Sequence, residues 1–212
     1  MIACRMLWLV CLLFACGGDA TPPETAPDPV IEQPTPAVAV APSDAQAPER
    51  PEALTADQCD SVEGGAAPDG PGCLSGTLTC GQTTVGHTLG GGNHFTSQFY
   101  DKKHCTPATT NHDGGDERVY RLDIPEGDRR VTIHLDTPCA DLDLAAMRWS
   151  GEDCPTIDDA IRACDMWPKP DNKAEKVTIV SREAATYFVV VEGKDEQEGA
   201  FSLTVDCADG LY

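Results

Sequence analysis

Basic and aromatic residues are scarce in this chain of 212 residues. It holds 15 lysines and arginines against 35 aspartates and glutamates, so the formal net charge is −20, and aromatic residues make up 6% of it. A surface of that charge repels the phosphates of nucleic acids and anionic lipid headgroups. We therefore expect no nucleic-acid partner and no electrostatic attachment to a membrane.

Long hydrophobic runs are also missing. The apolar run at residues 6–14 has nine residues, whereas a helix that crosses a bilayer needs about 20. A positively charged start, a short apolar run and a small residue are typical of an export signal. We therefore expect residues 1–15 to be a signal peptide.

The signal ends in Leu13-Phe14-Ala15-Cys16, which resembles the lipobox of bacterial lipoproteins. The resemblance implies cleavage before Cys16 and acylation of its thiol and its new amino group. Two or more acyl chains anchor a protein stably, whereas one does so only marginally. Cys16 is thus the expected membrane anchor, and the alternative is an ordinary signal peptide cut elsewhere. Which bacterial membrane holds the anchor stays open.

Aromatic residues are absent from the stretch that follows. Residues 17–52 hold nine of the 17 prolines, and Arg50 is the one basic residue there. Such a composition cannot bury enough apolar surface to offset the loss of chain entropy. Proline favours extended conformations of about 3.1 Å per residue. We expect residues 16–54 to form a disordered tether that leads to one globular domain at residues 55–212.

Cysteine is abundant, but the Cys-x-x-Cys spacing of zinc ribbons and thioredoxin-type sites does not occur. Of the 11 cysteines, Cys4 and Cys11 belong to the signal and Cys16 takes the lipid. An even number of cysteines in an exported domain predicts disulfides. The eight candidates are Cys59, Cys73, Cys80, Cys105, Cys139, Cys154, Cys164 and Cys207.

The pairing of these cysteines is open to many solutions. We expect a bond between Cys154 and Cys164, because it would close a small loop between two strand-like segments. We also expect Cys207, at the end of the last strand, to pair with Cys80 or Cys139. On that strand Cys207 shares a face with apolar residues, so its side chain is predicted to point into the core.

The domain is rich in short segments of β-type composition. Many alternate apolar and polar residues with a period of two, and glycine, proline and aspartate separate them. Eight such segments, with frequent turns, predict an all-β fold, a disulfide-stapled and jelly-roll-like β-sandwich. They are residues 75–80, 83–89, 118–124, 130–136, 142–149, 176–181, 186–193 and 200–207.

Two other segments carry different expectations. Residues 156–164 predict a short helix, with Thr156 as its cap and two aspartates in its first turn. Residues 89–95, LGGGNHF, lack the Lys-Ser/Thr of a phosphate-binding loop and predict a mobile loop.

Residues 115–207 resemble the bacterial pre-peptidase C-terminal domain, and more closely its disulfide-bearing variants. The resemblance implies a jelly-roll-like sandwich that accompanies secreted hydrolases or stands on surface lipoproteins. It is carried by GDERVYRLDIPEG (115–127), VTIHLDTPCADLDLAAMRW (131–149), CPTIDDAIRAC (154–164) and VTIVSREAATYFVVVEGKDEQEGAFSLTV (177–205).

Acidic residues gather at the starts or ends of predicted strands, and such loops can bind calcium. Calcium needs six to eight oxygen ligands, often carboxylates. Turn capping by carboxylates explains the same pattern without a metal, so no cofactor is required and calcium is an optional one. The candidate ligands are Asp113, Asp116, Glu117, Asp136, Asp141 and Asp143.

Catalytic motifs are lacking. No Gly-x-Ser-x-Gly occurs, and the five histidines show no His-x3-His or His-Glu-x-x-His spacing. We therefore expect no catalytic residue. Trp149 and Trp167 are candidates for stacking on a sugar or peptide, and Trp167, in a proline-rich loop, is the one that we select. The alternative is that Trp167 covers an edge of the sandwich.

Together these features predict an exported, membrane-anchored lipoprotein that displays a non-catalytic binding module at the cell envelope. Its partner is an unidentified protein or glycan. Alternatives are an accessory domain of a separate secreted hydrolase and a calcium-dependent substrate-binding module. A stand-alone hydrolase is a further hypothesis.

Overall fold

The computed structural model describes residues 52–65, 73–105, 111–166 and 174–211. All of them belong to one compact unit, Gln46–Tyr212. The predicted signal peptide, Cys16, most of the predicted tether and Trp167 lie outside the described residues. No helix among the described residues is both long and apolar enough to cross a bilayer.

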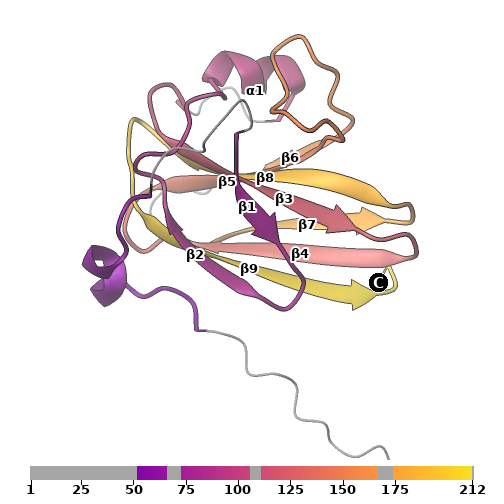
Figure 1. Ribbon diagram of the computed structural model, residues 1–212, viewed down its shortest axis with the longest axis horizontal. Helices are drawn as coiled ribbons and strands as arrows, with labels where there is room; N and C mark the ends of the chain where they lie inside the picture. The colour runs from indigo at the N-terminus through magenta and orange to yellow at the C-terminus, as the bar shows by residue number, and fades with distance from the viewer. Residues whose placement is uncertain (1–51, 66–72, 106–110, 167–173, 212) are drawn as a thin grey trace, which may run out of the picture. The chain divides into compact units, whose positions relative to one another are not determined.

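Alternating apolar residues build two β-sheets that face each other (Figure 1). The first has the order β1 (Leu74–Leu78), β3 (Glu117–Ile124), β8 (Ala185–Gly193), β5 (Leu142–Arg148) and β6 (Cys164–Met166). The second has the order β2 (Thr83–His87), β9 (Ala200–Asp209), β4 (Arg129–Asp136) and β7 (Glu175–Ser181). Within the described strands, β1 and β3 run parallel and the other pairs are antiparallel. The predicted all-β sandwich and its eight strands are confirmed, and β6 is a ninth strand that was not predicted.

The main core lies between the two sheets. On β4, for example, Val131, Ile133 and Leu135 are buried while the residues between them are at least partly exposed. Residues in phase with them on the other strands, such as Leu144 and Phe201, join the same cluster. Each fully buried side chain of this size contributes about 1.5–3 kcal/mol of transfer free energy. The period of two thus assigns β4 and β7 their inner faces, whereas β5 and β8 are buried on both faces.

The outer face of the first sheet is also covered. A helix, α1 (Ser97–Lys103), and nearby loops pack Phe95, Phe99 and Tyr100 onto it and form a second core. We call residues 93–105 together with 154–163 the cap; Figure 1 shows α1 lying over this sheet. Within the segment predicted to be a mobile loop, Phe95 is therefore fully buried.

Short-range hydrogen bonds explain where α1 begins and ends. The side chain of Thr96 accepts a hydrogen bond from the amide of Phe99 and caps the first turn. His104 ends the helix in the left-handed conformation, with φ of 57°. Lys102 and Lys103 lie in the last turn, where the helix dipole favours positive charge.

The helix predicted at residues 156–164 is wrong. The amide and the hydroxyl of Thr156 both bond to the carboxylate of Asp159, at 2.7 Å each, and the segment forms a turn. Such side-chain bonds compete with helix formation. The last residue of the segment, Cys164, begins β6 instead.

Four disulfides cross-link the domain: Cys59–Cys139, Cys73–Cys154, Cys80–Cys207 and Cys105–Cys164. The expected Cys154–Cys164 bond is wrong. The loop between these two cysteines packs into the second core, where each meets a cysteine of a segment far away in sequence.

The last strand carries a further correction. Cys207 bonds to Cys80, one of its two expected partners. Its side chain lies on the inner face of β9, opposite Val131 of β4, but it is exposed and not buried in the core. Beyond Val205 the strand continues past the part of the sandwich that covers its inner face, so in-phase positions there reach solvent.

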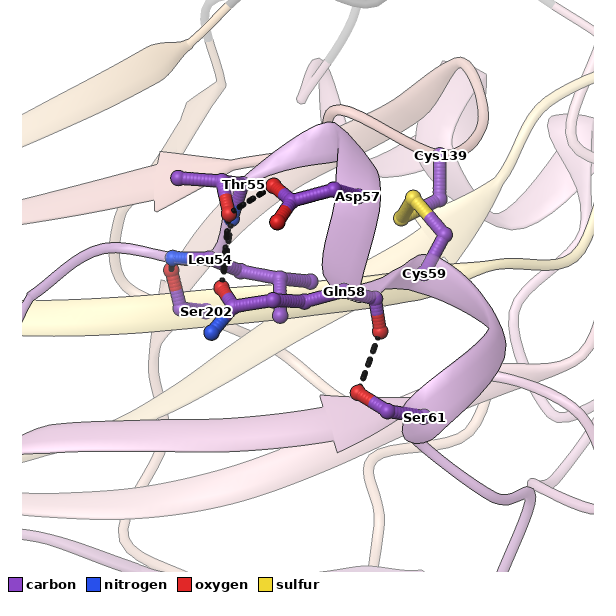
Figure 2. Close-up of a disulfide and its surroundings, with 8 residues drawn as sticks. All are labelled: Leu54, Thr55, Asp57, Gln58, Cys59, Ser61, Cys139 and Ser202. Carbon is purple, nitrogen blue, oxygen red and sulfur yellow. Dashed lines mark hydrogen bonds between the residues drawn. A yellow bond between two sulfur atoms is a disulfide. The ribbon is translucent and has the colours of Figure 1, made fainter.

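The first described segment is fixed to the sandwich by a hydrogen bond and a disulfide (Figure 2). A short 3₁₀ helix, η1 (Ala56–Ser61), starts with a capping box formed by Thr55 and Gln58. The amide of Leu54 donates to the hydroxyl of Ser202 on β9 at 3.0 Å. Cys59 then bonds to Cys139 in the loop that follows β4.

Candidate functional site

A groove of about 500 Å³ opens at one end of the first sheet, where β3 and β5 end and β8 begins. We call it the arginine groove. Its lining combines two guanidinium groups, one indole, one carboxylate and two hydroxyls, contributed by Asp123, Arg148, Trp149, Ser150, Arg162 and Thr186.

Backbone pairing brings the two arginines together. The amide of Arg148 bonds to the carbonyl of Ala163 at 2.8 Å, and the amide of Arg162 bonds to the carbonyl of Arg148 at 3.3 Å. Two residues of one segment thus oppose one residue of β5, which is the arrangement of a β-bulge. Bulges redirect side chains and are common beside functional sites. Here the bulge directs both guanidinium groups to one groove.

The positive charge of the groove is only partly balanced. Arg148 pairs with Glu183 at 3.3 Å, and Glu183 is 79% exposed, so this surface pair contributes about 0–1 kcal/mol. Arg162 is exposed, and no side chain in the described part of the chain pairs with its guanidinium. The groove therefore offers an accessible cation in a chain of net charge −20.

Trp149 is held in a fixed position. Its indole nitrogen donates to the carbonyl of Asp153 at 2.7 Å. Gly151 lies so close that a Cβ atom added there would be 2.5 Å from the ring. The ring also packs against the second core, so its partly exposed remainder forms a rigid wall of the groove.

Asp123 contributes the carboxylate of the groove lining. Its carboxylate accepts hydrogen bonds from Arg121 at 2.9 Å and from the hydroxyl of Thr186 at 2.6 Å. The Arg121 guanidinium, with help from Thr186, holds the pKa of Asp123 below its ordinary value. Asp123 is therefore an ionised hydrogen-bond acceptor at neutral pH.

A second polar site lies between the first sheet and the cap. Glu117, Glu192 and Asp143 are neighbours across β3, β8 and β5, and all three are buried. Tyr100 donates to Glu192, and His112 pairs with Asp143 at 2.9 Å. We call these five residues the buried carboxylate cluster.

Burial sets the protonation of this cluster. It raises the pKa of Glu117 to about 7, although the amides of His94 and Phe95 donate to that carboxylate. Burial likewise raises the pKa of Glu192 well above its ordinary value. A charged carboxylate is costly in such surroundings, so at least part of this cluster is neutral near pH 7.

The six candidate calcium ligands do not meet at one site. Glu117 and Asp143 belong to the buried carboxylate cluster, while Asp113, Asp116 and Asp141 accept from the amide of Ser97, the amide of Gly90 and the amine of Lys194, respectively. Asp136 is the last residue of β4. Across the described ranges, no group of three or more histidine, cysteine, aspartate or glutamate side chains is arranged to hold a metal ion.

Sequence reasoning missed most of the two sites. Glu192 is in phase with the buried Phe188 and Val190 of β8, and that phase is the signal that could have identified it as a buried acid. Arg162 lies in the segment predicted as a helix, where its neighbours in space could not be derived. Trp149, considered for stacking, lines the arginine groove, whereas the preferred Trp167 lies outside the described residues.

No family model matches the chain, and no curated protein matches it. Among solved structures, it is similar to the pre-peptidase C-terminal domain of a collagenase from Bacillus anthracis, the family that the sequence resembles. The TM-score is 0.37 with 14% identity, over 68% of this chain and 96% of that one. It is also similar to CorA, a surface-associated copper-binding protein of Methylomicrobium album BG8, with a TM-score of 0.38 and 9% identity, over 63% of this chain and 98% of that one. TM-scores below 0.5 are too low for these likenesses to carry an argument about what this chain does.

Proposed function

We propose that this chain is an exported, lipid-anchored and non-catalytic binding module, and that the arginine groove is its ligand site. The observation that carries the proposal is the convergence of Arg148, Arg162 and the fixed ring of Trp149 on one groove of an otherwise acidic domain. Grooves of about 500 Å³ with a few convergent polar groups are of the size that holds small ligands.

Export and anchoring are supported by different features. Four disulfides are typical of proteins that fold in an oxidising compartment. The lipobox-like residues at Cys16 provide the anchor, and the proline-rich tether would hold the domain away from the headgroups. Labelling cells with radioactive palmitate tests the anchor: the wild-type chain should carry the label in the membrane fraction, and Cys16→Ala should lose it. Labelling of the variant would overturn this part of the proposal.

The groove is tested by arrays of neutral sugars, acidic sugars and peptides of either charge. The double variant Arg148→Gln, Arg162→Gln should lose the signals that the wild-type chain gives. A matched control, Arg130→Gln with Arg182→Gln, removes the same charge at two exposed arginines that do not line the groove. This control should keep the array signals of the wild-type chain. If every array signal survives the groove variant, the groove is not the ligand site.

A further inference from the structure

The side chains of the arginine groove also indicate the class of ligand. We propose that the groove binds an acidic sugar of the hexuronate class, one or two rings long. This inference rests on the proposed function, since it names the ligand of the same groove.

The amides of Arg148, Trp149 and Arg162 are not available to pair with an extended peptide. Peptides that add to a sheet need free amides and carbonyls along a strand edge. The amides of Arg148 and Arg162 are bonded within the domain, and the amide of Trp149 donates to the carbonyl of Thr186 at 3.1 Å. At these three residues, recognition therefore depends on the side chains.

These side chains match the functional groups of a sugar acid. The exposed guanidinium of Arg162 can donate two parallel hydrogen bonds to one carboxylate. The carboxylate of Asp123 can accept hydrogen bonds from sugar hydroxyls, and Ser150 offers a further hydroxyl at the rim. The exposed part of the Trp149 indole can pack against the C–H face of a pyranose ring. A hexuronate carries a carboxylate, hydroxyls and an apolar ring face on six carbons.

The charge distribution disfavours a densely acidic peptide. The ionised Asp123 stands in the same groove as the two arginines, so a ligand with carboxylates on every residue would bring one of them against it. The net charge of −20 repels such a polyanion as a whole. A sugar acid separates each carboxylate from the next by a ring that bears hydroxyls, so both charges of the groove can be satisfied.

Calorimetric titration of the full-length lipidated chain in detergent tests this inference with three probes: digalacturonate, the neutral galactobiose and triglutamate. We expect digalacturonate to bind at least tenfold more tightly than either of the others. Arg162→Gln should weaken digalacturonate binding about tenfold, because it removes a charge-assisted pair, and leave galactobiose unchanged. Arg182→Gln, exposed and outside the groove, is the matched control and should change neither.

Each other result has a definite meaning. Equal binding of triglutamate, with the same dependence on Arg162, would overturn the sugar class and leave the groove as the ligand site. Equal binding of galactobiose, with no effect of Arg162→Gln, would overturn the acidic character of the ligand. If none of the three probes binds, the hexuronate inference is wrong, and the array decides the proposed function independently.

Discussion

At the scale of single residues, the unusual feature is a carboxylate triad inside a hydrophobic layer. Glu117, Asp143 and Glu192 occupy neighbouring positions on three strands and are each no more than 1% exposed. Each could face either the main core or the cap, and the phase of its strand places it under the cap. Protonation of Glu117 and Glu192 lowers the energetic cost of burying these carboxylates. Hydrogen bonds lower it further, because Tyr100 donates to Glu192 and two backbone amides donate to Glu117.

Glu117 should make the domain less stable as the pH rises. Its pKa is about 7 in the folded chain against an ordinary value of 4.5. The folded state thus binds the proton more tightly, and this contribution is fully present below about pH 4.5 and lost as the pH rises through about 7. Urea unfolding at pH 5 and pH 8 should show a loss on the order of 3 kcal/mol from this group, which Glu117→Gln should abolish.

The exposed turn residue Glu126 provides the control for this measurement. Glu126→Gln should leave the difference between pH 5 and pH 8 as it is in the wild-type chain. An unchanged pH dependence in Glu117→Gln would contradict the assignment, because it would mean that Glu117 has the same pKa in the folded and unfolded chains.

At the scale of elements, the cap distinguishes this domain from a plain two-layer sandwich. Helix α1 has only seven residues, too few to be stable alone. It depends on its capping residue, on the aromatic contacts of Phe95, Phe99 and Tyr100, and on the Cys105–Cys164 bond directly after it. The same loops hold Arg162 and the surroundings of Trp149, so the cap also supports the arginine groove.

Loss of Thr96, the N-cap residue of α1, should therefore lower the free energy of unfolding more than loss of a surface charge on the same helix. Thr96→Ala removes the acceptor for the Phe99 amide and should lower the free energy of unfolding by about 1 kcal/mol. Lys102→Ala breaks an exposed pair with Asp158 and should cost less than about 0.5 kcal/mol. Equilibrium unfolding in urea measures both, and equal losses would argue against the capping role of Thr96.

At the scale of the whole domain, the four disulfides differ in access to solvent. Cys80 and Cys207 are both exposed, whereas in each of the bonds Cys73–Cys154 and Cys105–Cys164 one cysteine is buried. The two bonds with a buried cysteine fasten segments of the cap. The exposed bond joins the turn before β2 to the end of β9.

A mild reductant should therefore open Cys80–Cys207 first. Thiol–disulfide exchange requires access of the attacking thiolate to a sulfur atom. Brief reduction followed by alkylation and mass spectrometry should label Cys80 and Cys207 before Cys73, Cys105, Cys154 and Cys164. Prior labelling of Cys105 and Cys164 would mean that the cap opens in the native state more readily than its burial indicates.

The sequence by itself determined the β-sandwich, because β-type composition and, in strands such as β4 and β7, a period of two are local properties of the chain. The even set of eight cysteines likewise indicated disulfides. Only the tertiary structure decided which cysteines meet, because Cys73 and Cys154, or Cys105 and Cys164, come together through loops that fold over the outer face of a sheet. The same holds for Arg148 and Arg162, which a bulge brings side by side. Contacts between segments far apart in sequence depend on packing, and no local pattern of residues encodes them.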